Sequence, residues 1–494
     1  MRLASRCLCA FVVSYALVVS GALAQERLFV SVPSANNEGS LKSAVLAVNP
    51  SAFSQALSAP ESAQQRIELP LPGTEVRVLV NRFEVFDDAT VVNLITANGP
   101  VRFVPQKQLL LSGRVDGIAN SRVVLAVLPD QVYGIVTMNG RQLYVQPFDR
   151  VAGTSIAFAA ETAQHPTPWT CGQEDIKDQP PIAPMPPIQQ GKKGGADQQQ
   201  RLIRTLALAI EGDYDMFLDH GQNAAKAAAY AEAVTAASSD IFFRDVDAKL
   251  RVKQFELWTV VDPYTSTNSG GMLTQFRDRW RTLHANIDRA VAVLLSGVNN
   301  IGGVAYVNVL CSKQNGYAVV GLNNNVNYPA TGYVWDTDVM AHELGHNVGS
   351  LHTHSCTWAP PIDSCVAAEN GNCYTGTKPV LGTIMSYCHL TNRGTSLEFH
   401  PRVSALLSTR INAAACRELI SSLTVDARAD TTVCHGDTIR LTATIGGGTA
   451  PIVVTWSGPN VIDATGPNPR AVVTATGTYR VTVRDATNSL AIDS

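Results

Sequence analysis

The chain has 494 residues, which suggests about three domains, and its hydrophobic fraction of 45% is ordinary for globular proteins. Its charged fraction is 16%, its formal net charge is -3, and it contains no basic run or acidic tail. This charge pattern argues against nucleic acid or an anionic membrane surface as a partner.

The first residues have the form of a secretory signal peptide. Arg2 and Arg6 precede an almost wholly apolar or small stretch, Cys7–Leu23, and the A-L-A sequence at 22–24 offers a cleavage site. We therefore expect residues 1–24 to be removed and the protein to be secreted, in some hosts through a periplasm. An uncleaved membrane anchor is the alternative, and no later stretch is long and apolar enough to span a bilayer.

Residues 25–177 are expected to form a β-rich domain. Apolar and polar residues alternate at period two, for example at 75–80 and 122–127, and turn signals such as Asn139-Gly140 separate these runs. Residues 178–200 are rich in Pro, Gly, Lys and Gln, which favours an exposed linker. Within it, Lys192-Lys193 offers a site for proteolytic cutting.

Residues 201–421 are predicted to form an α/β domain with a mostly parallel sheet. Strand patterns at 202–210, 252–261 and 290–295 alternate with helical patterns at 224–238 and 273–283. Six of the eight cysteines that follow the signal peptide lie from Cys311 to Cys416, and this even cluster predicts three disulfides in an oxidising compartment.

Residues 422–494 return to strand patterns. Alternation is clean at 438–442 and 478–483, a Gly run at 446–448 marks a turn, and Trp456 can fill a core. We expect an Ig-like or PKD-like β-sandwich. The fold class is therefore multidomain, with a β-rich N-terminal domain, an α/β domain and a C-terminal β-sandwich.

The segment His342–His352 reads H-E-L-G-H-N-V-G-S-L-H. On a helix, His342 and His346 are four residues apart and share a face, so both imidazoles can reach one metal ion. Gly349 permits a left-handed turn that returns His352 to the same ion. Three imidazoles and one open position are typical of a catalytic zinc site, whereas a chance H-E-x-x-H on an ordinary helix lacks this extension.

Glu343 projects differently from its neighbour His342, and we interpret it as the general base that activates water, not as a ligand. The whole pattern resembles that of the metzincin zinc endopeptidases, which also carry a downstream Met-turn. The sequence G-T-I-M-S-Y-C at 382–388 supplies that turn. By this resemblance Met385 forms a hydrophobic floor under the histidines, and the substrates are proteins or peptides.

Sequence runs at 112–117, 120–125 and 134–147 resemble the propeptide of reprolysins, the adamalysin or ADAM-like branch of the metzincins. This resemblance implies that residues 25–177 are an inhibitory propeptide and that the protein is made as a latent precursor. Two positions depart from the reprolysin pattern. Thr353 follows the third histidine where Asp is usual, and Tyr387 follows Met385 by two residues, as in astacins and serralysins. Tyr387 either binds the oxyanion or the zinc, or is a packed aromatic.

Cys171 is the only cysteine in residues 25–177. A lone thiolate is a strong zinc ligand that would fill the fourth position in the latent form, and metzincin propeptides commonly use such a cysteine switch. The competing interpretation is a disulfide from Cys171 to Cys434. Without that bridge, Cys434 is expected to be a buried free thiol.

Family analogy implies the bridge Cys311–Cys416. Proximity favours Cys356–Cys388 and Cys365–Cys373, although sequence alone does not fix connectivity.

The remaining candidates are less specific. Residues 302–307 match the place where metzincins have an edge strand that pairs with extended substrate, and a plain sheet strand is the alternative. His354 is expected on the surface or behind the ligands, and His389 and His400 to be structural, because three imidazoles already suffice. Calcium at Asp288 would follow from family analogy, but no further ligands for it are recognisable, so zinc is the predicted cofactor.

Two functions from different classes fit these observations. The first is a secreted zinc-dependent endopeptidase. The second is a non-catalytic binding protein that uses the C-terminal sandwich. The presence of Glu343 together with three histidines and a Met-turn favours the enzyme.

Overall fold

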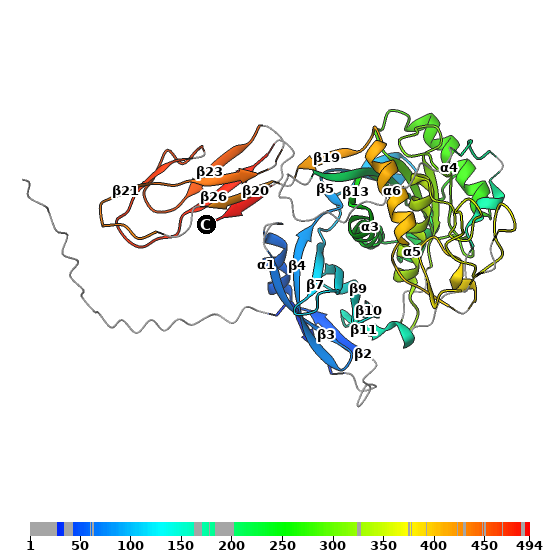
Figure 1. Ribbon diagram of the computed structural model, residues 1–494, viewed down its shortest axis with the longest axis horizontal. Coiled ribbons are helices and arrows are strands. Elements are labelled where there is room, and N and C mark those ends of the chain that lie inside the picture. Colours follow the sequence, from blue (N-terminus) through cyan, green and yellow to red (C-terminus); the bar gives the residue numbers. More distant parts are fainter. Residues whose placement is uncertain are drawn as a thin grey trace, which may run out of the picture.

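The structure, a computed structural model, arranges the chain in an N-terminal β region, a central α/β region and a C-terminal β region (Figure 1). The expected signal peptide and the Lys192-Lys193 site lie outside the residues that it describes. The described residues are 27–33, 43–59, 61, 64–162, 170–176, 178–182, 202–323, 328–373, 376, 378–391, 393–421, 423–427, 431–446, 448, 451–466, 468–485 and 490–494.

The N-terminal region is β-rich, as the period-two patterns predict. A nine-stranded antiparallel sheet has the order β1-β2-β11-β10-β9-β8-β7-β4-β3. Its alternate apolar residues, such as Val80, Leu125 and Val145, form a core that also buries Phe53 of helix α1. The elements are β1 Phe29–Ser31, β2 Ser43–Val48, α1 Pro50–Ser58, β3 Gln65–Leu71, β4 Thr74–Phe83, β7 Leu109–Val115, β8 Arg122–Leu128, β9 Gln131–Met138, β10 Arg141–Asp149 and β11 Thr154–Ala159.

The central region is an α/β domain with a mostly parallel sheet, as predicted. Strands β16, β14, β12 and β13 run parallel, while β15 and β19 pair antiparallel with β16 and β12. Its elements are β12 Leu202–Gly212, α2 Tyr214–Asp219, α3 Ala224–Val246, β13 Ala248–Trp258, α4 Ser269–Leu283, β14 Val291–Ser296, β15 Val304–Ala305, β16 Tyr317–Gly321, α5 Gly332–Val348, β17 Leu381–Gly382, β18 Gly394–Thr395, α6 Pro401–Ala413 and β19 Glu418–Ser421.

A hairpin from the N-terminal region completes this second sheet. Strands β5 (Phe86–Thr96) and β6 (Gly99–Arg102) leave the first sheet after β4, and β5 pairs parallel with β13. The Thr90 hydroxyl donates to the Val252 carbonyl at 2.7 Å, and the Val252 N–H donates to the Val85 carbonyl at 2.8 Å. The two regions therefore share one sheet, although the sequence places a linker between them.

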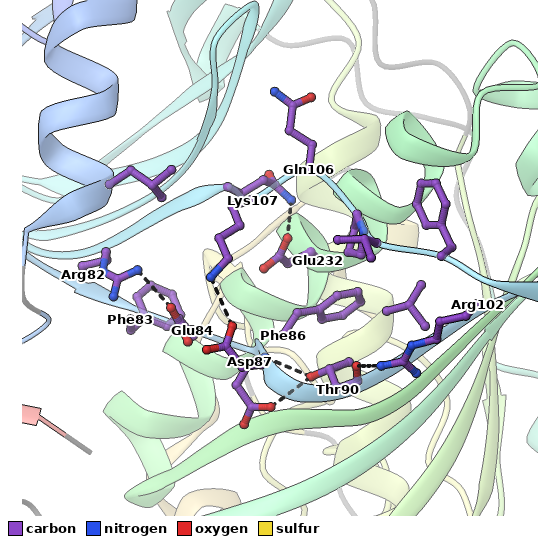
Figure 2. A pocket seen from close by; sticks show the side chains of 17 residues that line it. Arg82, Phe83, Glu84, Phe86, Asp87, Thr90, Arg102, Gln106, Lys107 and Glu232 are labelled. Carbon is purple, nitrogen blue, oxygen red and sulfur yellow. Dashed lines mark hydrogen bonds and ion pairs between the residues drawn. The ribbon is translucent and has the colours of Figure 1, made fainter. Parts of the chain in front are cut away.

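Helix α3 lies between the two sheets (Figure 1), and its buried Glu232 and Asp240 contact residues of the N-terminal region. The Gln108 amide donates to the Glu232 carboxylate at 2.8 Å, and Arg122 forms an ion pair with Asp240. Figure 2 shows Glu232 and Lys107 at the pocket where the chain passes between the sheets. Burial raises the pKa of Glu232 to about 8, although the Gln108 hydrogen bond acts in the opposite direction.

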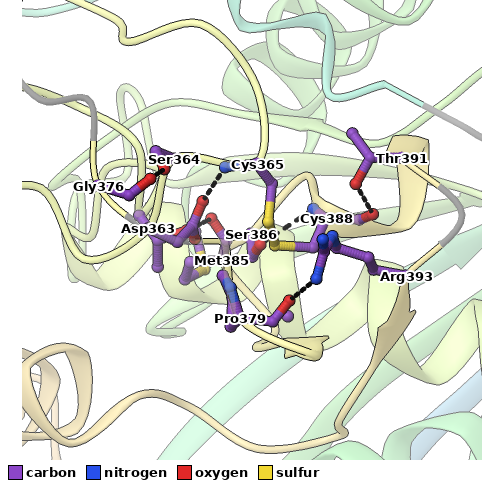
Figure 3. Close-up of a disulfide and its surroundings, with 12 residues drawn as sticks. Asp363, Ser364, Cys365, Gly376, Pro379, Met385, Ser386, Cys388, Thr391 and Arg393 are labelled. Atoms are coloured by element: carbon purple, nitrogen blue, oxygen red, sulfur yellow. Dashed lines mark hydrogen bonds between the residues drawn. A yellow bond between two sulfur atoms is a disulfide. The ribbon is translucent and has the colours of Figure 1, made fainter.

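The disulfides confirm one predicted pairing and correct the other two. Cys311 is bonded to Cys416, as family analogy implied. The other bridges are Cys356–Cys373 and Cys365–Cys388, so the pairings predicted from proximity are wrong. The Cys356 N–H donates to the Glu369 carbonyl at 2.8 Å, which folds the loop back on itself, and Figure 3 shows Cys365 beside the turn that carries Cys388.

The two other cysteines that the structure describes are free. Cys171 is buried, and Cys434 is exposed, so the expectation of a buried thiol at Cys434 is wrong. The bridge between these two cysteines is not formed.

The C-terminal strands share a small apolar core around Trp456, Val454 and Val481. They form a two-stranded sheet, β20-β22, and two three-stranded sheets, β21-β25-β24 and β23-β26-β27. The strands are β20 Thr424–Ala427, β21 Thr438–Arg440, β22 Ala443–Gly446, β23 Val453–Ser457, β24 Val461–Ile462, β25 Arg470–Val472, β26 Arg480–Arg484 and β27 Leu490–Asp493. No helix among the described residues is long and apolar enough to cross a membrane.

Candidate metal centre

Three histidine side chains converge at the C-terminal end of α5. His342 and His346 share one face of the helix, and their Nε2 atoms lie 3.1 Å apart. The helix ends at Val348, and Gly349 follows with a φ of 122°, which any residue with a side chain would adopt only under strain; the chain then turns back. This turn brings the Nε2 atom of His352 to 3.2 Å from that of His346.

The hydrogen bonds behind these rings show why a cation fits between them. The Nδ1 atoms of His342 and His346 lie 2.5 Å and 2.8 Å from the carbonyl oxygens of Ile384 and Ser350, so both Nδ1 atoms must carry the proton. Their Nε2 lone pairs then face one another. Burial and the neighbouring imidazoles lower the pKa of His342, and burial lowers that of His346 to about 3. A cation would relieve the repulsion between these neutral rings, and three imidazole nitrogens suit zinc.

Two further side chains, Cys171 from the segment 170–176 and Glu343 from α5, lie beside this cluster. The Cys171 sulfur and the three imidazoles form a group of ligand atoms within 4.8 Å of one another. The Cys171 thiol donates to Glu343 Oε2 at 3.5 Å, while the buried Glu343 Oε1 has no hydrogen-bond partner among the described residues. Burial, followed by the charge of Glu343, raises the pKa of Cys171 well above its ordinary value, an effect that a bound cation would reverse.

A separate turn at residues 382–388 carries the two remaining predicted site residues, Met385 and Tyr387. Met385 is buried with its sulfur against Gly345 of α5, where an added Cβ would lie 2.6 Å from that sulfur. The Tyr387 ring packs 4.4 Å from the ring of His352, between centroids. Thr353, which stands where reprolysins usually have Asp, donates to the Met385 carbonyl through both its N–H (2.9 Å) and its hydroxyl (3.0 Å).

Glu369 is a site residue that the sequence analysis missed. Its Oε1 atom lies 2.7 Å from His352 Nδ1 and 3.0 Å from His354 Nε2, so His354 is buried behind the ligand cluster and not on the surface. Glu369 belongs to no motif, and the loop closed by Cys356–Cys373 brings it to the site.

The other candidates lie outside the cluster. The His400 ring nitrogen accepts from the Arg402 N–H at the start of α6, and the His389 ring packs 5.4 Å from that of Trp335, between centroids. Asp288 forms a 2.7 Å ion pair with Lys313.

A segment that we call the strap, residues 170–176 and 178–182, crosses the site along β15. The Gly172 N–H donates to the Gly303 carbonyl at 2.8 Å, and the Gln173 amide donates to the Ala305 carbonyl. Further on, the Gln179 side chain bonds both the N–H (3.1 Å) and the carbonyl (3.3 Å) of Val307. The strap therefore occupies the edge at residues 303–307.

Comparisons with known proteins agree with this arrangement. A reprolysin family model described as metallo-peptidase family M12 matches residues 203–396. Over 184 residues the chain is 24% identical to a zinc metalloproteinase/disintegrin of Bitis gabonica, and the alignment covers 35% of this chain and 53% of that relative. The chain thus spans about half the length of this relative. Residues 203–396 are thus similar to the reprolysin-type metzincins of metallopeptidase family M12.

Proposed function

We propose that this chain is a secreted zinc-dependent endopeptidase made as a latent precursor. One observation carries the proposal: three imidazole Nε2 atoms converge, with Nδ1 anchored behind each ring, beside the buried carboxylate of Glu343. His342, His346 and His352 are the proposed zinc ligands. Zinc, when bound there, supplies Lewis-acid chemistry for hydrolysis of the peptide bond.

The protein groups around the ligands have separate roles in this proposal. Glu343 is the general base that takes a proton from water and passes it to the leaving amine. Tyr387 is the hydrogen-bond donor to the oxyanion that forms on the substrate carbonyl. Met385 packs against the part of α5 that carries the ligands. This packing sets the distance between that part of α5 and the turn that carries Tyr387.

Latency follows from the position of the strap. Cys171 is the proposed fourth ligand in the precursor, and residues 25–177 are the proposed propeptide. The strap bonds of Gly172 and Gln179 cover the edge that an extended substrate would need. Removal of the strap would open the ligand position and the edge together.

Two further parts of the proposal concern export and the C-terminal region. Three disulfides support an oxidising compartment, and we infer that residues 1–24 direct the chain there. We also infer that residues 422–494 form an Ig-like or PKD-like sandwich. Binding through that sandwich without catalysis is the competing function.

The test uses the processed form of the secreted chain. Casein should be digested without a chelator and spared with one. Glu343→Ala should keep about one zinc per chain while turnover falls by about two to four orders of magnitude. A variant that retains wild-type turnover would exclude Glu343 as the base, and a wild-type protein that binds zinc but cuts nothing would favour the binding protein.

A further inference from the structure

The strap holds a second charged contact away from the metal centre. The Asp178 carboxylate forms an ion pair with the Arg277 guanidinium, and the Tyr306 hydroxyl donates to the same carboxylate at 3.0 Å. Partial burial opposes ionisation of Asp178, but the hydrogen bonds from Arg277 and Tyr306 outweigh it, and the pKa of Asp178 is lowered. A carboxylate is therefore bound here as an anion.

The receiving side of this contact is built into the α/β domain. The side chain of Arg277, on α4, is 9% exposed, whereas that of Asp178 is 47% exposed. Arg277 uses Nε and Nη2 to hold Asp278, and its Nη1 atom faces Asp178 and Tyr306. The guanidinium also lies over the Tyr306 ring, 5.6 Å from its centroid. One edge of the guanidinium is thus fixed, and the other is presented to an incoming acid.

The position of Tyr306 is coupled to the helix that carries the histidines. The Asn347 amide of α5 donates to the Tyr306 carbonyl at 2.9 Å, and the Asn308 N–H donates to the His346 carbonyl at 2.9 Å. These bonds set the distance between the Arg277–Tyr306 pair and the metal centre.

The same edge connects the carboxylate contact to the reacting groups. Gly303 lies against Glu343, because a Cβ at Gly303 would be 2.1 Å from Glu343 Oε1. The strap runs in the same direction as this edge, since Gly172 bonds Gly303 and Gln179 bonds Val307. A substrate that replaces the strap along this edge would pass Glu343 and then reach Arg277.

We propose that Arg277 and Tyr306 form a subsite for an acidic side chain in the substrate-binding edge. Asp178 fills the subsite in the precursor, and an Asp or Glu of a protein substrate fills it in the processed enzyme. This inference rests on the proposed function and adds the substrate class. Once the strap leaves, the buried Nη1 atom of Arg277 loses its anionic partner, and a carboxylate is the group that satisfies it best.

The experiment compares Asp with Asn at each position on both sides of the cut bond, in peptides cleaved by the processed chain. At one position the kcat/KM for Asp should exceed that for Asn by about ten-fold, the size of one charge-assisted hydrogen bond. Arg277→Gln should bring this ratio close to one, and Tyr306→Phe should lower it in part. Arg281→Gln on the same helix is the matched control and should keep the wild-type ratio.

A binding arm separates this proposal from the proposed function. Processed Glu343→Ala protein is titrated with the peptide of residues 170–182, either in its natural sequence or with the substitution Asp178→Asn. The natural peptide should bind about ten-fold more tightly than the substituted one, and Arg277→Gln in the protein should abolish the difference. Equal binding, or a preference that survives Arg277→Gln, overturns the subsite whether or not any peptide is cut. Equal thermal midpoints and zinc contents show that the variants are folded.

Discussion

The Tyr387 hydroxyl is held by both ends of one residue: it accepts a hydrogen bond from the Cys171 N–H at 2.9 Å and donates one to the Cys171 carbonyl at 3.2 Å. Burial, followed by the charges of Cys171 and Glu343, raises the pKa of Tyr387, so the hydroxyl keeps its proton. Cys171 of the strap therefore makes two contacts: its thiol faces the metal centre, and its backbone bonds the proposed oxyanion donor.

Replacement of Tyr387 by Phe tests this donor. In the processed chain, Tyr387→Phe should lower kcat by about two to three orders of magnitude, because one oxyanion donor is lost while the ring packing is kept. Zinc content should stay at the wild-type value. Tyr333→Phe is the control, since its hydroxyl bonds the Ala233 carbonyl within the core. Turnover of Tyr387→Phe at the wild-type rate would leave Tyr387 as a packed aromatic.

Latency is tested in the uncleaved precursor by Cys171→Ser. This change removes the proposed fourth ligand, so the precursor should show peptidase activity without processing. Cys434→Ser is the matched control, because Cys434 is also a free cysteine but is exposed. A Cys171→Ser precursor that stays silent with its strap bound would mean that the hydrogen bonds along residues 303–307 suffice for latency.

Glu369 should govern how tightly zinc is held. Its hydrogen bond to His352 Nδ1 fixes the ring orientation and directs Nε2 toward the metal. Glu369→Ala should weaken zinc binding by about 10–100-fold, as measured by chelator competition, and Glu369→Gln should restore part of it. The exposed residue Glu398 supplies the control variant Glu398→Ala. An unchanged zinc affinity in Glu369→Ala would contradict the prediction.

The buried carboxyl of Glu232 should make the stability of the precursor depend on pH. Its pKa is about 8 in the folded chain and near 4.5 when exposed, so the folded form retains a proton that the unfolded form releases. The stabilising effect is full below about pH 4.5 and is lost as pH rises through about pH 8. The thermal midpoint should fall over this range, and less steeply in Glu232→Gln. Glu75→Gln, at an exposed position, should follow the wild-type curve.

Local spacing predicted those features that depend on local geometry. The four-residue spacing of His342 and His346 and the glycine at 349 specify how the rings meet, because helix periodicity and a left-handed turn are properties of the nearby chain. The strands at 202–210 and 290–295 could also be predicted from the sequence, since each is a short apolar run that becomes a buried strand.

Features that depend on contacts between distant chain segments could not be predicted from the sequence. Glu369 reaches His352 only through a folded loop, and the pairings of Cys356 and Cys365 follow from that loop and not from sequence distance. The sequence of β5, residues 86–96, does not indicate which of the two sheets receives this strand. The contact of Asp178 with Arg277 spans 99 residues and has no pattern of its own.

The hairpin β5–β6 means that cutting the chain and separating its parts are distinct events. After a cut near residue 192, six residue pairs would still join β5 to β13 along the sheet, and Arg122 would still be paired with Asp240. Departure of the N-terminal part would require peeling a strand from the sheet, and it would leave β13 (Ala248–Trp258) with open N–H and carbonyl groups on one side. An unpaired strand edge can form hydrogen bonds with strands of other chains. On activation, the released enzyme would therefore expose an edge that favours association with other chains.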